Sequence, residues 1–335
     1  MIDWVTAIIP CNHQPDKLID GFVMSFDKLG QQQWLVNKKL SVEGSHSSKI
    51  QIKSWDDKHI WFSGNPAKFL QGHNIFGSDD LRALMSKFFD ELLTHDELGL
   101  CPDAWQLKQV RVGAYDVTKV DFNLSWHLEH KNAVLSWIRA AQQAANLRRR
   151  GSGQFTGDTL YFGKHSRFWA LKCYSKGHEI AAKNHTLPKE LQIPELIEWA
   201  NKALRLELVL HSMYLKKTGL NRVSAWTKNT GKELLLSVIR DDLQISDNMT
   251  LPDNVLKDIP TRLKGFYALW ATGEDLRQVM SKASFYRYRT QLLKYGVDIT
   301  VIQDKERNNV VPLIRYLEAL PAEIPQWAYE KGLVA

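Results

Sequence analysis

The chain has 335 residues, 44% hydrophobic and 24% charged, so it is long enough for two domains with buried cores. A formal net charge of +7 favours a polyanionic partner, because lysine and arginine side chains placed on phosphates release condensed counterions. The three cysteines match neither a zinc site nor a disulfide framework, the first residues lack the layout of a signal peptide, and no apolar run reaches membrane-spanning length. We therefore expect a protein of a reducing cytoplasm, with no membrane partner.

The first third of the chain predicts a β-meander, because short strand-like runs alternate with Gly, Asp and Ser. The expected strands are Trp4–Ile9, Phe22–Phe26, Gln33–Val42, Lys49–Trp55 and His59–Phe62. A short helix should follow, capped at Asn65-Pro66 and stopped at Gly72. Ser78 is expected to cap a longer helix, in which apolar residues from Leu81 to Leu93 recur at helical spacing.

Strands and helices mix in the next part of the chain. We expect strands at Leu107–Val112, Val117–Trp126, Thr159–Phe162, Phe168–Lys176 and Leu204–Leu210, and helices at Asn132–Arg149 and Pro194–Lys202. This order predicts an α+β fold with a mainly antiparallel sheet and helices packed on one face. After residue 220 the pattern is mostly helical, which divides the chain into residues 1–220 and a helical C-terminal domain, residues 221–335.

Three of these strands each have an apolar side and a polar side, because side chains alternate across a strand. The polar positions are Lys119, Asp121, Asn123 and Ser125 on the first strand, Lys172, Tyr174 and Lys176 on the second, and Arg205 and Glu207 on the third. A solvated sheet face is the commonest reason for such alternation. The composition nevertheless suits phosphodiester transfer, which needs a nucleophile, hard oxygen ligands for a metal, and cations near the phosphate.

Six segments follow one another in an order typical of a known family. They are Gly64–Gly77, Thr118–Asp121, Leu171–Glu179, Leu204–Glu207, Tyr214–Leu220 and Asn309–Tyr316. In these segments the chain resembles the filamentous-phage gene II replication protein family and, more distantly, the tyrosine replication initiators of small rolling-circle plasmids. The run Lys68–Gly77 is the most specific of them, whereas the Tyr-x-Lys and Arg-x-Glu signals are short.

The resemblance implies a nicking–closing enzyme that cuts one strand of a circular duplex at a replication origin. The cut leaves the 5′ phosphate on a tyrosine and a free 3′ hydroxyl as primer, and the displaced strand is later rejoined. By this resemblance Tyr174 is the nucleophile, Lys176 lowers the pKa of the phenol or steadies the pentavalent state, and Arg205 belongs to the same catalytic set. The implied partners are double-stranded origin DNA, the displaced single strand, a host helicase and a replication polymerase, and a homodimer is left open.

The same resemblance implies a divalent metal, Mg²⁺ or Mn²⁺, held by Asp121 and Glu207 with Glu179 as a weaker third ligand. Many tyrosine nickases hold their metal with a His-hydrophobe-His pair, which this chain lacks, so we prefer carboxylate ligands. His73 lies in the most specific segment. It is either a ligand or phosphate contact, or a side chain that ties the turn at Gly72 together, and these two interpretations weigh about equally.

Several cations are candidates for DNA contacts. They are Lys119 and Lys172 on the polar face, the run Arg148, Arg149 and Arg150, and the residues Tyr286, Arg287 and Arg289. The arginine run is either a basic loop beside DNA or a solvated helix end. Segments Glu274–Met280 and Ser284–Tyr295, with Ser284 as cap, form either a helix-turn-helix or an ordinary helical hairpin, and the basic charge favours the first.

Three functions compete on this pattern: a nickase, a non-catalytic regulator that binds an origin or operator, and a single-strand-binding or packaging protein. Asp121 and Glu207 distinguish them, because carboxylates that face phosphate weaken a binding module and are required by a metal-dependent nickase. The sequence therefore favours the nickase.

Overall fold

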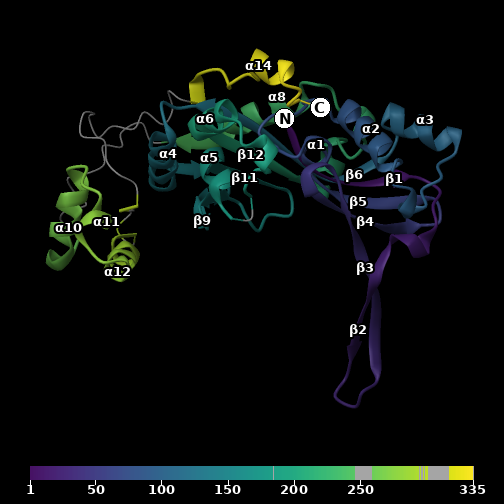
Figure 1. Cartoon of the computed structure of the whole chain (residues 1–335), viewed down its shortest axis with the longest axis horizontal. Coiled ribbons are helices and arrows are strands. Elements are labelled where there is room, and N and C mark those ends of the chain that lie inside the picture. Colours follow the sequence, from purple (N-terminus) through teal and green to yellow (C-terminus); the bar gives the residue numbers. More distant parts are fainter. Residues whose placement is uncertain are drawn as a thin grey trace.

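The computed structural model describes residues 1–183, 185–245, 259–293, 295, 297, 299–300 and 317–334 (Figure 1). Its centre is a ten-stranded sheet in which every neighbouring pair of strands is antiparallel. In spatial order the strands are β2 (Ile19–Phe26), β3 (Gln32–Glu43), β4 (Lys49–Asp56), β5 (His59–Gly64), β1 (Ile2–Pro10), β6 (Asp116–His127), β12 (Ala203–His211), β11 (Trp169–Ser175), β10 (Thr159–Phe162) and β9 (Gln154–Thr156). The predicted α+β class with a mainly antiparallel sheet is confirmed.

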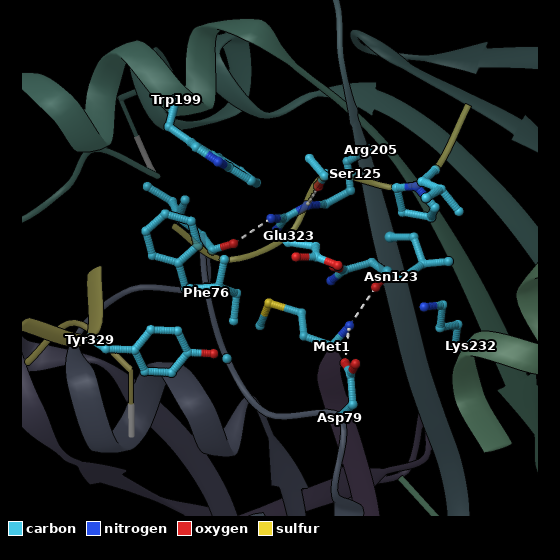
Figure 2. Close-up of a pocket in the computed structure, with 17 residues that line it drawn as sticks. Met1, Phe76, Asp79, Asn123, Ser125, Trp199, Arg205, Lys232, Glu323 and Tyr329 are labelled. Atoms are coloured by element: carbon cyan, nitrogen blue, oxygen red, sulfur yellow. Dashed lines mark hydrogen bonds and ion pairs between the residues drawn. The ribbon is translucent and has the colours of Figure 1, made fainter. Parts of the chain in front are cut away.

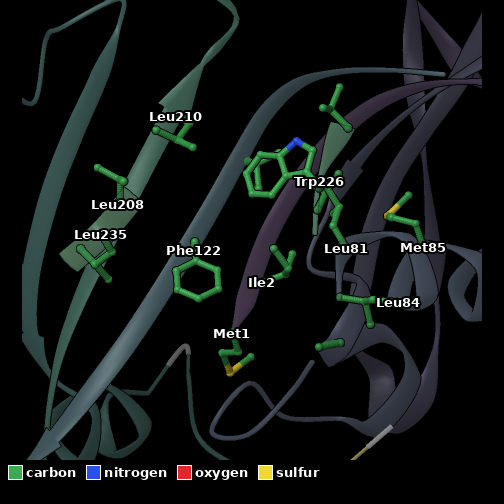
Figure 3. Packing of buried hydrophobic residues seen from close by; sticks show 14 of the residues in the cluster. Met1, Ile2, Leu81, Leu84, Met85, Phe122, Leu208, Leu210, Trp226 and Leu235 are labelled. Carbon is green, nitrogen blue, oxygen red and sulfur yellow. The ribbon is translucent and has the colours of Figure 1, made fainter. Parts of the chain in front are cut away.

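One face of this sheet is apolar and carries the main core. Phe122 on β6 lies opposite Leu208 on β12, and Ile2 on β1 pairs with Phe122 from the other side. The helices that share this core are α2 (Leu81–Leu92), α3 (Ala104–Val112), α4 (Lys131–Ala144) and α8 (Thr230–Ser237). Figure 3 shows the α2 side chains near Ile2 and the α8 residue Leu235 near Phe122. Helix α8 approaches so closely that a Cβ at Gly231 would clash with the Phe122 ring.

The opposite face is covered only in part. The loop of residues 73–77 lies on it together with α5 (Lys176–Ala181), α6 (Pro194–Lys202) and α14 (Gln326–Glu330), around a second core of Phe76, Leu196 and Ala328. Toward β1, β5 and β4 the same face carries partly exposed side chains. The β2–β3 hairpin projects away from the body (Figure 1).

Local capping chemistry decides several element boundaries. Helix α1 (Pro66–Gln71) is capped by Asn65, whose side chain accepts a hydrogen bond from the Lys68 amide, and it ends at Gly72 with φ of 79°, as predicted. The predicted Ser78 cap is wrong. Asp80 caps α2 by accepting from the Ala83 amide, while Ser78 accepts from the amide of Asp80 itself.

The predicted strand Leu107–Val112 is also wrong, because this segment lies in helix α3. A capping box joins Asp103 and Gln106 at its start, and Gly113 ends it in the left-handed region. The predicted strand Phe168–Lys176 ends one residue early, since Ser175 caps α5 and Lys176 begins that helix.

The predicted helix Asn132–Arg149 is too long, because α4 ends at Ala144. Residues Ala145–Leu147 form β7, with its two end side chains buried and Asn146 exposed, which is strand periodicity. Strand β7 pairs with β8 (Gly151–Ser152) and β13 (Leu243–Ile245) in a separate three-stranded sheet.

Helices also make up much of the described chain after residue 211. They are α7 (Ser212–Thr218), α8, the π-helical turn Val238–Asp242, α10 (Thr261–Ala271), α11 (Leu276–Val279), α12 (Lys282–Leu293) and α14. Helices α10 to α12 enclose their own core around Leu263, Leu276 and Phe285. At the start of α12, Ser281 accepts a hydrogen bond from the Ser284 amide, so the predicted Ser284 cap is wrong. The segment Asn309–Tyr316 lies outside the described residues.

No helix in the described part of the chain combines the length and the apolar composition that a membrane span requires.

Candidate functional site

Strands β6, β11 and β12 bring Asp121, Tyr174 and Glu207 to one face of the sheet. In the antiparallel register Glu207 lies opposite Lys172 on one side and opposite Asn123, two residues from Asp121, on the other. Alternation places Tyr174 on the same face, two residues from Lys172. Asp121, Tyr174 and Glu207 are buried to 2%, 8% and 3% exposure, so this is an interior polar centre and not a solvated face.

The Tyr174 hydroxyl donates a hydrogen bond to Glu207 Oε2 at 2.9 Å. Burial, with Glu207 and Glu179 nearby, raises the pKa of the Tyr174 phenol well above its usual value of 10, so the phenol is protonated at neutral pH. Burial also raises the pKa of the Glu207 carboxyl to about 7, against the lowering effect of Lys172. The phenol proton therefore lies on a direct path to a carboxylate that can accept it near neutral pH.

Lys172 lies between the two strand carboxylates. Its Nζ is 2.5 Å from Glu207 Oε1 and 3.4 Å from Asp121 Oδ2, and Lys119 Nζ lies 3.1 Å from the same Asp121 oxygen. Asp3 also acts electrostatically on this ammonium. Although burial alone disfavours the charge, Glu207 and Asp121 hold the pKa of Lys172 above its ordinary range. Both lysines predicted to contact DNA thus lie at this centre as partners of its carboxylates.

The donor set at this centre suits a hard divalent ion in its chemistry. Asp121 Oδ1 is buried and has no hydrogen-bond partner in the structure, which leaves one carboxylate oxygen beside Glu207 available as a ligand. Within the described residues, however, no three or more His, Cys, Asp or Glu side chains are grouped as a metal cluster. Glu179 pairs instead with Lys176 at 2.7 Å. Asp121 and Glu207 are therefore the two residues that fit such an ion.

A second polar network lies at the covered end of the face. Lys176 is fully buried, and its Nζ donates to Asn74 Oδ1 and to Glu179 Oε2, both at 2.7 Å. Burial lowers the pKa of Lys176, and Lys176 in turn lowers the pKa of the Glu179 carboxyl. Asn74 Nδ2 donates to Asp3 Oδ1 at 2.9 Å, which connects this network to β1.

Arg205 is also almost fully buried and holds the loop of residues 73–77. Its Nη1 donates to the Asn74 carbonyl at 2.6 Å, its Nη2 to the Ile75 carbonyl at 2.7 Å, and its Nε to Ser125 Oγ at 3.1 Å. The two bonds to the loop satisfy backbone acceptors that the loop could not otherwise pair. Arg205 lies opposite Tyr174 in the register, so the loop is anchored directly beside the tyrosine.

His73 lies inside the same loop with no exposed surface. Its Nδ1 accepts a hydrogen bond from the Ile75 amide at 3.2 Å, and burial followed by the charge of Lys176 lowers the pKa of the imidazole to about 4. The ring is therefore neutral at physiological pH. Its observed contact is the one expected of a side chain that ties the turn together.

A cavity of about 470 Å³ adjoins this covered end (Figure 2). Its lining includes Phe76, Trp199, Arg205 and Ser125, and segment 320–324 and Tyr329 contribute from the C-terminal part of the chain. Neither Tyr174 nor Glu207 lines it. The cavity is thus separated from the tyrosine centre by the Arg205 side chain and the loop that it holds.

The remaining candidate DNA contacts lie elsewhere. Arg148 and Arg149 are exposed in the turn between β7 and β8, while Arg150 stacks 4.8 Å from the centroid of the Trp169 ring. Because Trp169 is an odd-numbered position of β11, it faces away from Lys172 and Tyr174. The arginine turn is therefore on the other side of the sheet from the tyrosine centre.

On helix α12, Tyr286 is 51% exposed and Arg287 is exposed with its guanidinium 5.0 Å from the Tyr288 ring, while Arg289 is partly buried. Tyr288 itself stacks on Phe266 of α10, so α12 packs in the small core through this ring. Tyr286 and Arg287 keep exposed surface and are accessible to a partner.

Two features of the site were not predicted from the sequence: the part played by Asp3 and its pairing with two asparagines. Asp3 accepts from Asn65 Nδ2 at 2.6 Å as well as from Asn74, and both asparagines come from the Gly64–Gly77 segment. The only local sign was an aspartate next to the otherwise apolar run of the first strand. Its partners lie 62 and 71 residues away, which no local pattern indicates.

The fold and the site define a class: a basic α+β protein whose antiparallel sheet presents a buried tyrosine–carboxylate centre flanked by lysines. The chain belongs to the replication-associated protein family of the filamentous-phage gene II type. The N-terminal description of that family matches residues 1–229, and its C-terminal description matches residues 253–334. The resemblance to the gene II type is thereby confirmed.

Relatives match over most of both chains. The chain is 38% identical to the replication-associated protein of Enterobacteria phage I2-2, over 97% of this chain and 95% of the relative. It is 25% identical to the protein of the same description from Enterobacteria phage f1, over 86% and 83%, and 24% identical to that of Salmonella phage IKe, over 85% and 80%.

Proposed function

We propose that this protein initiates rolling-circle DNA replication by nicking one strand at a phage or plasmid origin through Tyr174 and later rejoining the displaced strand. The observation that carries the proposal is the 2.9 Å hydrogen bond from the Tyr174 hydroxyl to Glu207, a carboxyl with a pKa of about 7. A general base is most effective when its pKa lies near the working pH. Membership of a replication-associated family supplies the biological setting.

The chemistry follows from that bond. The Tyr174 oxygen attacks the scissile phosphorus while its proton passes to Glu207 Oε2. The bond between phosphorus and the 3′ oxygen breaks, and that oxygen leaves with the bonding electron pair and takes a proton from solvent. The products are a 5′ phosphate ester on Tyr174 and a free 3′ hydroxyl. Rejoining is the reverse: a 3′ hydroxyl attacks the phosphotyrosine, and the proton held by Glu207 returns to the phenol oxygen.

The lysines beside the tyrosine suit a phosphate. Lys119 and Lys172 are 31% and 22% exposed, and a phosphate that approaches Tyr174 meets both ammonium groups. Lys176 and Arg205 act differently in this proposal. They touch the covering loop and not the solvent, so we assign them the positioning of Tyr174 from beneath.

A divalent ion, Mg²⁺ or Mn²⁺, is part of the proposal. Asp121 and Glu207 would hold it, because Asp121 Oδ1 is a buried oxygen without a partner. When bound, the ion would polarise the phosphate and stabilise charge on the leaving oxygen.

The proposed partners are the origin duplex and the displaced single strand, with a host helicase and polymerase in the host cytoplasm. A non-catalytic origin- or operator-binding regulator is the second candidate function, and the exposed Tyr286 and Arg287 on α12 favour it. Such a regulator gains nothing from a buried tyrosine hydrogen-bonded to a carboxylate. We therefore place DNA recognition by α12 alongside nicking and not in its place.

The test is the conversion of a supercoiled origin plasmid to the nicked form in Mg²⁺. Tyr174→Phe removes one oxygen and should abolish nicking while origin binding stays near normal. Tyr161→Phe is the matched control, because Tyr161 lies on β10 opposite Lys172 and is partly exposed. Tyr115 is a weaker alternative nucleophile, since its ring is buried in the main core and burial strongly raises its pKa. Normal nicking by Tyr174→Phe would move the nucleophile elsewhere.

A further inference from the structure

The polar face of the sheet continues beyond the tyrosine centre onto β1, β5, β4 and β3, which lie side by side (Figure 1). Lys119, an ion-pair partner of Asp121, lies opposite Thr6, Thr6 opposite Ser63, and Ser63 opposite Gln51. The parallel row two residues away runs from Ile8 through Trp61 to Lys53 and then reaches Lys39. These rows lead from the site across four strand spacings.

Tryptophan rings and lysine ammonium groups alternate along this surface. Lys119 Nζ lies 5.4 Å from the centroid of the Trp4 ring, and Lys39 Nζ lies 4.4 Å from that of Trp61. Lys53 Nζ lies 5.6 Å from both Trp61 and Trp55. Trp4 is 37% exposed and Trp55 53%, so part of each ring meets solvent.

The surface is built and not incidental. The Trp4 indole donates to Ser63 Oγ at 3.1 Å, and Ser63 Oγ is 2.9 Å from Thr6 Oγ1, so the ring is oriented by its neighbours on the face. The described positions of the two rows include no aspartate or glutamate between Lys119 and Lys39. The nearest carboxylate on the β3 side, Glu43, is paired with Lys49.

We propose that the strand to be cut lies single-stranded across this surface, with bases stacked on Trp4 and Trp61 and phosphates on Lys119, Lys53 and Lys39. This rests on the proposed function for the position of the scissile phosphate, but binding itself does not require the nicking step. Base faces are hidden in a duplex and accessible in a single strand, and stacking on aromatic rings combined with backbone cations is the general mode of single-strand binding. Flexible lysine stems let the ammonium groups move from the rings to phosphates.

The dimensions agree with a short segment of strand. Four strand spacings from β6 to β3 cover about 19 Å, which corresponds to roughly six nucleotides at a stacked spacing of about 3.4 Å. The segment would enter the tyrosine centre at Lys119, which contacts both Trp4 and Asp121.

The test measures affinity for a fluorescein-labelled oligothymidylate by anisotropy, in the full chain carrying Tyr174→Phe so that no cleavage occurs. Trp61→Ala should weaken binding about 5- to 100-fold, as expected for loss of one stacked base. Trp61→Tyr keeps a ring and should bind nearly as the parent does, which separates stacking from a folding defect. Lys39→Ala and Lys53→Ala should each reduce the slope of log affinity against log salt by about 0.7.

Trp105 and Lys108 provide matched controls. Both are exposed on α3, which packs on the other face of the sheet, so Trp105→Ala and Lys108→Ala should leave affinity and slope unchanged. Unchanged single-strand affinity in Trp61→Ala, or losses equal to those of the α3 controls, would overturn the proposal. Nicking by Tyr174→Phe would instead reject the proposed nucleophile and leave this binding result standing.

Discussion

The polar face of the sheet has two regions that differ in what they do with similar side chains. At the covered end, Lys176 and Arg205 are buried and their hydrogen bonds hold the loop of residues 73–77. At the open centre, Lys119 and Lys172 keep part of their surface exposed beside Tyr174. Residue type alone did not separate a cation that supports the fold from one that can meet a phosphate. The contacts of each ammonium or guanidinium group separate them.

Glu207→Gln tests the open centre. The variant keeps the shape of the side chain but cannot accept the phenol proton as a carboxylate does, so nicking should fall about 10²- to 10⁴-fold. In the parent the nicking rate should rise with pH through about 7 and then level off, because the carboxylate form of Glu207 is the base. The variant should lose this rise. Glu198→Gln, an exposed change on α6, should keep both rate and profile.

Arg205→Met tests the covered end. Removing the guanidinium leaves the carbonyls of Asn74 and Ile75 buried without their donor, so the free energy of unfolding should fall by about 3–5 kcal/mol. Urea unfolding measures this. Arg222→Met, at a half-exposed ion pair with Asp116, should change stability little. Full stability of Arg205→Met would mean that the two regions do not differ in the way described.

Much of this arrangement could be predicted from local pattern. Alternation of apolar and polar residues placed β6, β11 and β12 within one or two residues and put Asp121, Tyr174 and Glu207 on one face. The same reasoning failed at residues 107–112, where alternation suggested a strand but the Asp103–Gln106 capping box directs a helix.

The depth of Lys176 and Arg205 could not be predicted, because the loop that covers them comes from more than 100 residues earlier in the chain. Asp3 was missed for the same reason. A sequence pattern shows which face a side chain shares, and it does not show what lies on top of that face.

His73 gives a pH-dependent test of the covered end. The unfolded imidazole binds a proton below about pH 6.5, whereas the folded one does so only near pH 4, so the folded state loses stability as pH falls across this window. The loss should total about 3 kcal/mol and be absent from His73→Asn, which retains an acceptor for the Ile75 amide. The measurement is the difference between parent and variant urea midpoints from pH 7 to pH 4. An identical pH dependence would contradict a neutral buried ring, and exposed His165→Asn is the control.

The cations outside the sheet face should have smaller and more uniform effects. Arg287→Ala, if it removes a phosphate contact, should weaken binding to all duplexes and reduce the salt slope by about one unit, and a base contact should instead relax preference at one position by roughly 1–3 kcal/mol. The same measurements on Arg289→Ala and Arg149→Ala show whether α12 or the β7–β8 turn carries the contact. Binding to origin and random duplex at several salt concentrations decides it. No change in any of the three variants would assign origin recognition to other parts of the chain.

The most direct measurement is the site of covalent attachment. The protein is incubated with its supercoiled origin plasmid and Mg²⁺, the DNA is digested, and the protein peptides are mapped by mass spectrometry. The account predicts a 5′-linked nucleotide on Tyr174, whose hydroxyl is bonded to Glu207. An adduct on another residue such as Tyr161, or nicked plasmid with no protein attached to its 5′ end, would contradict it.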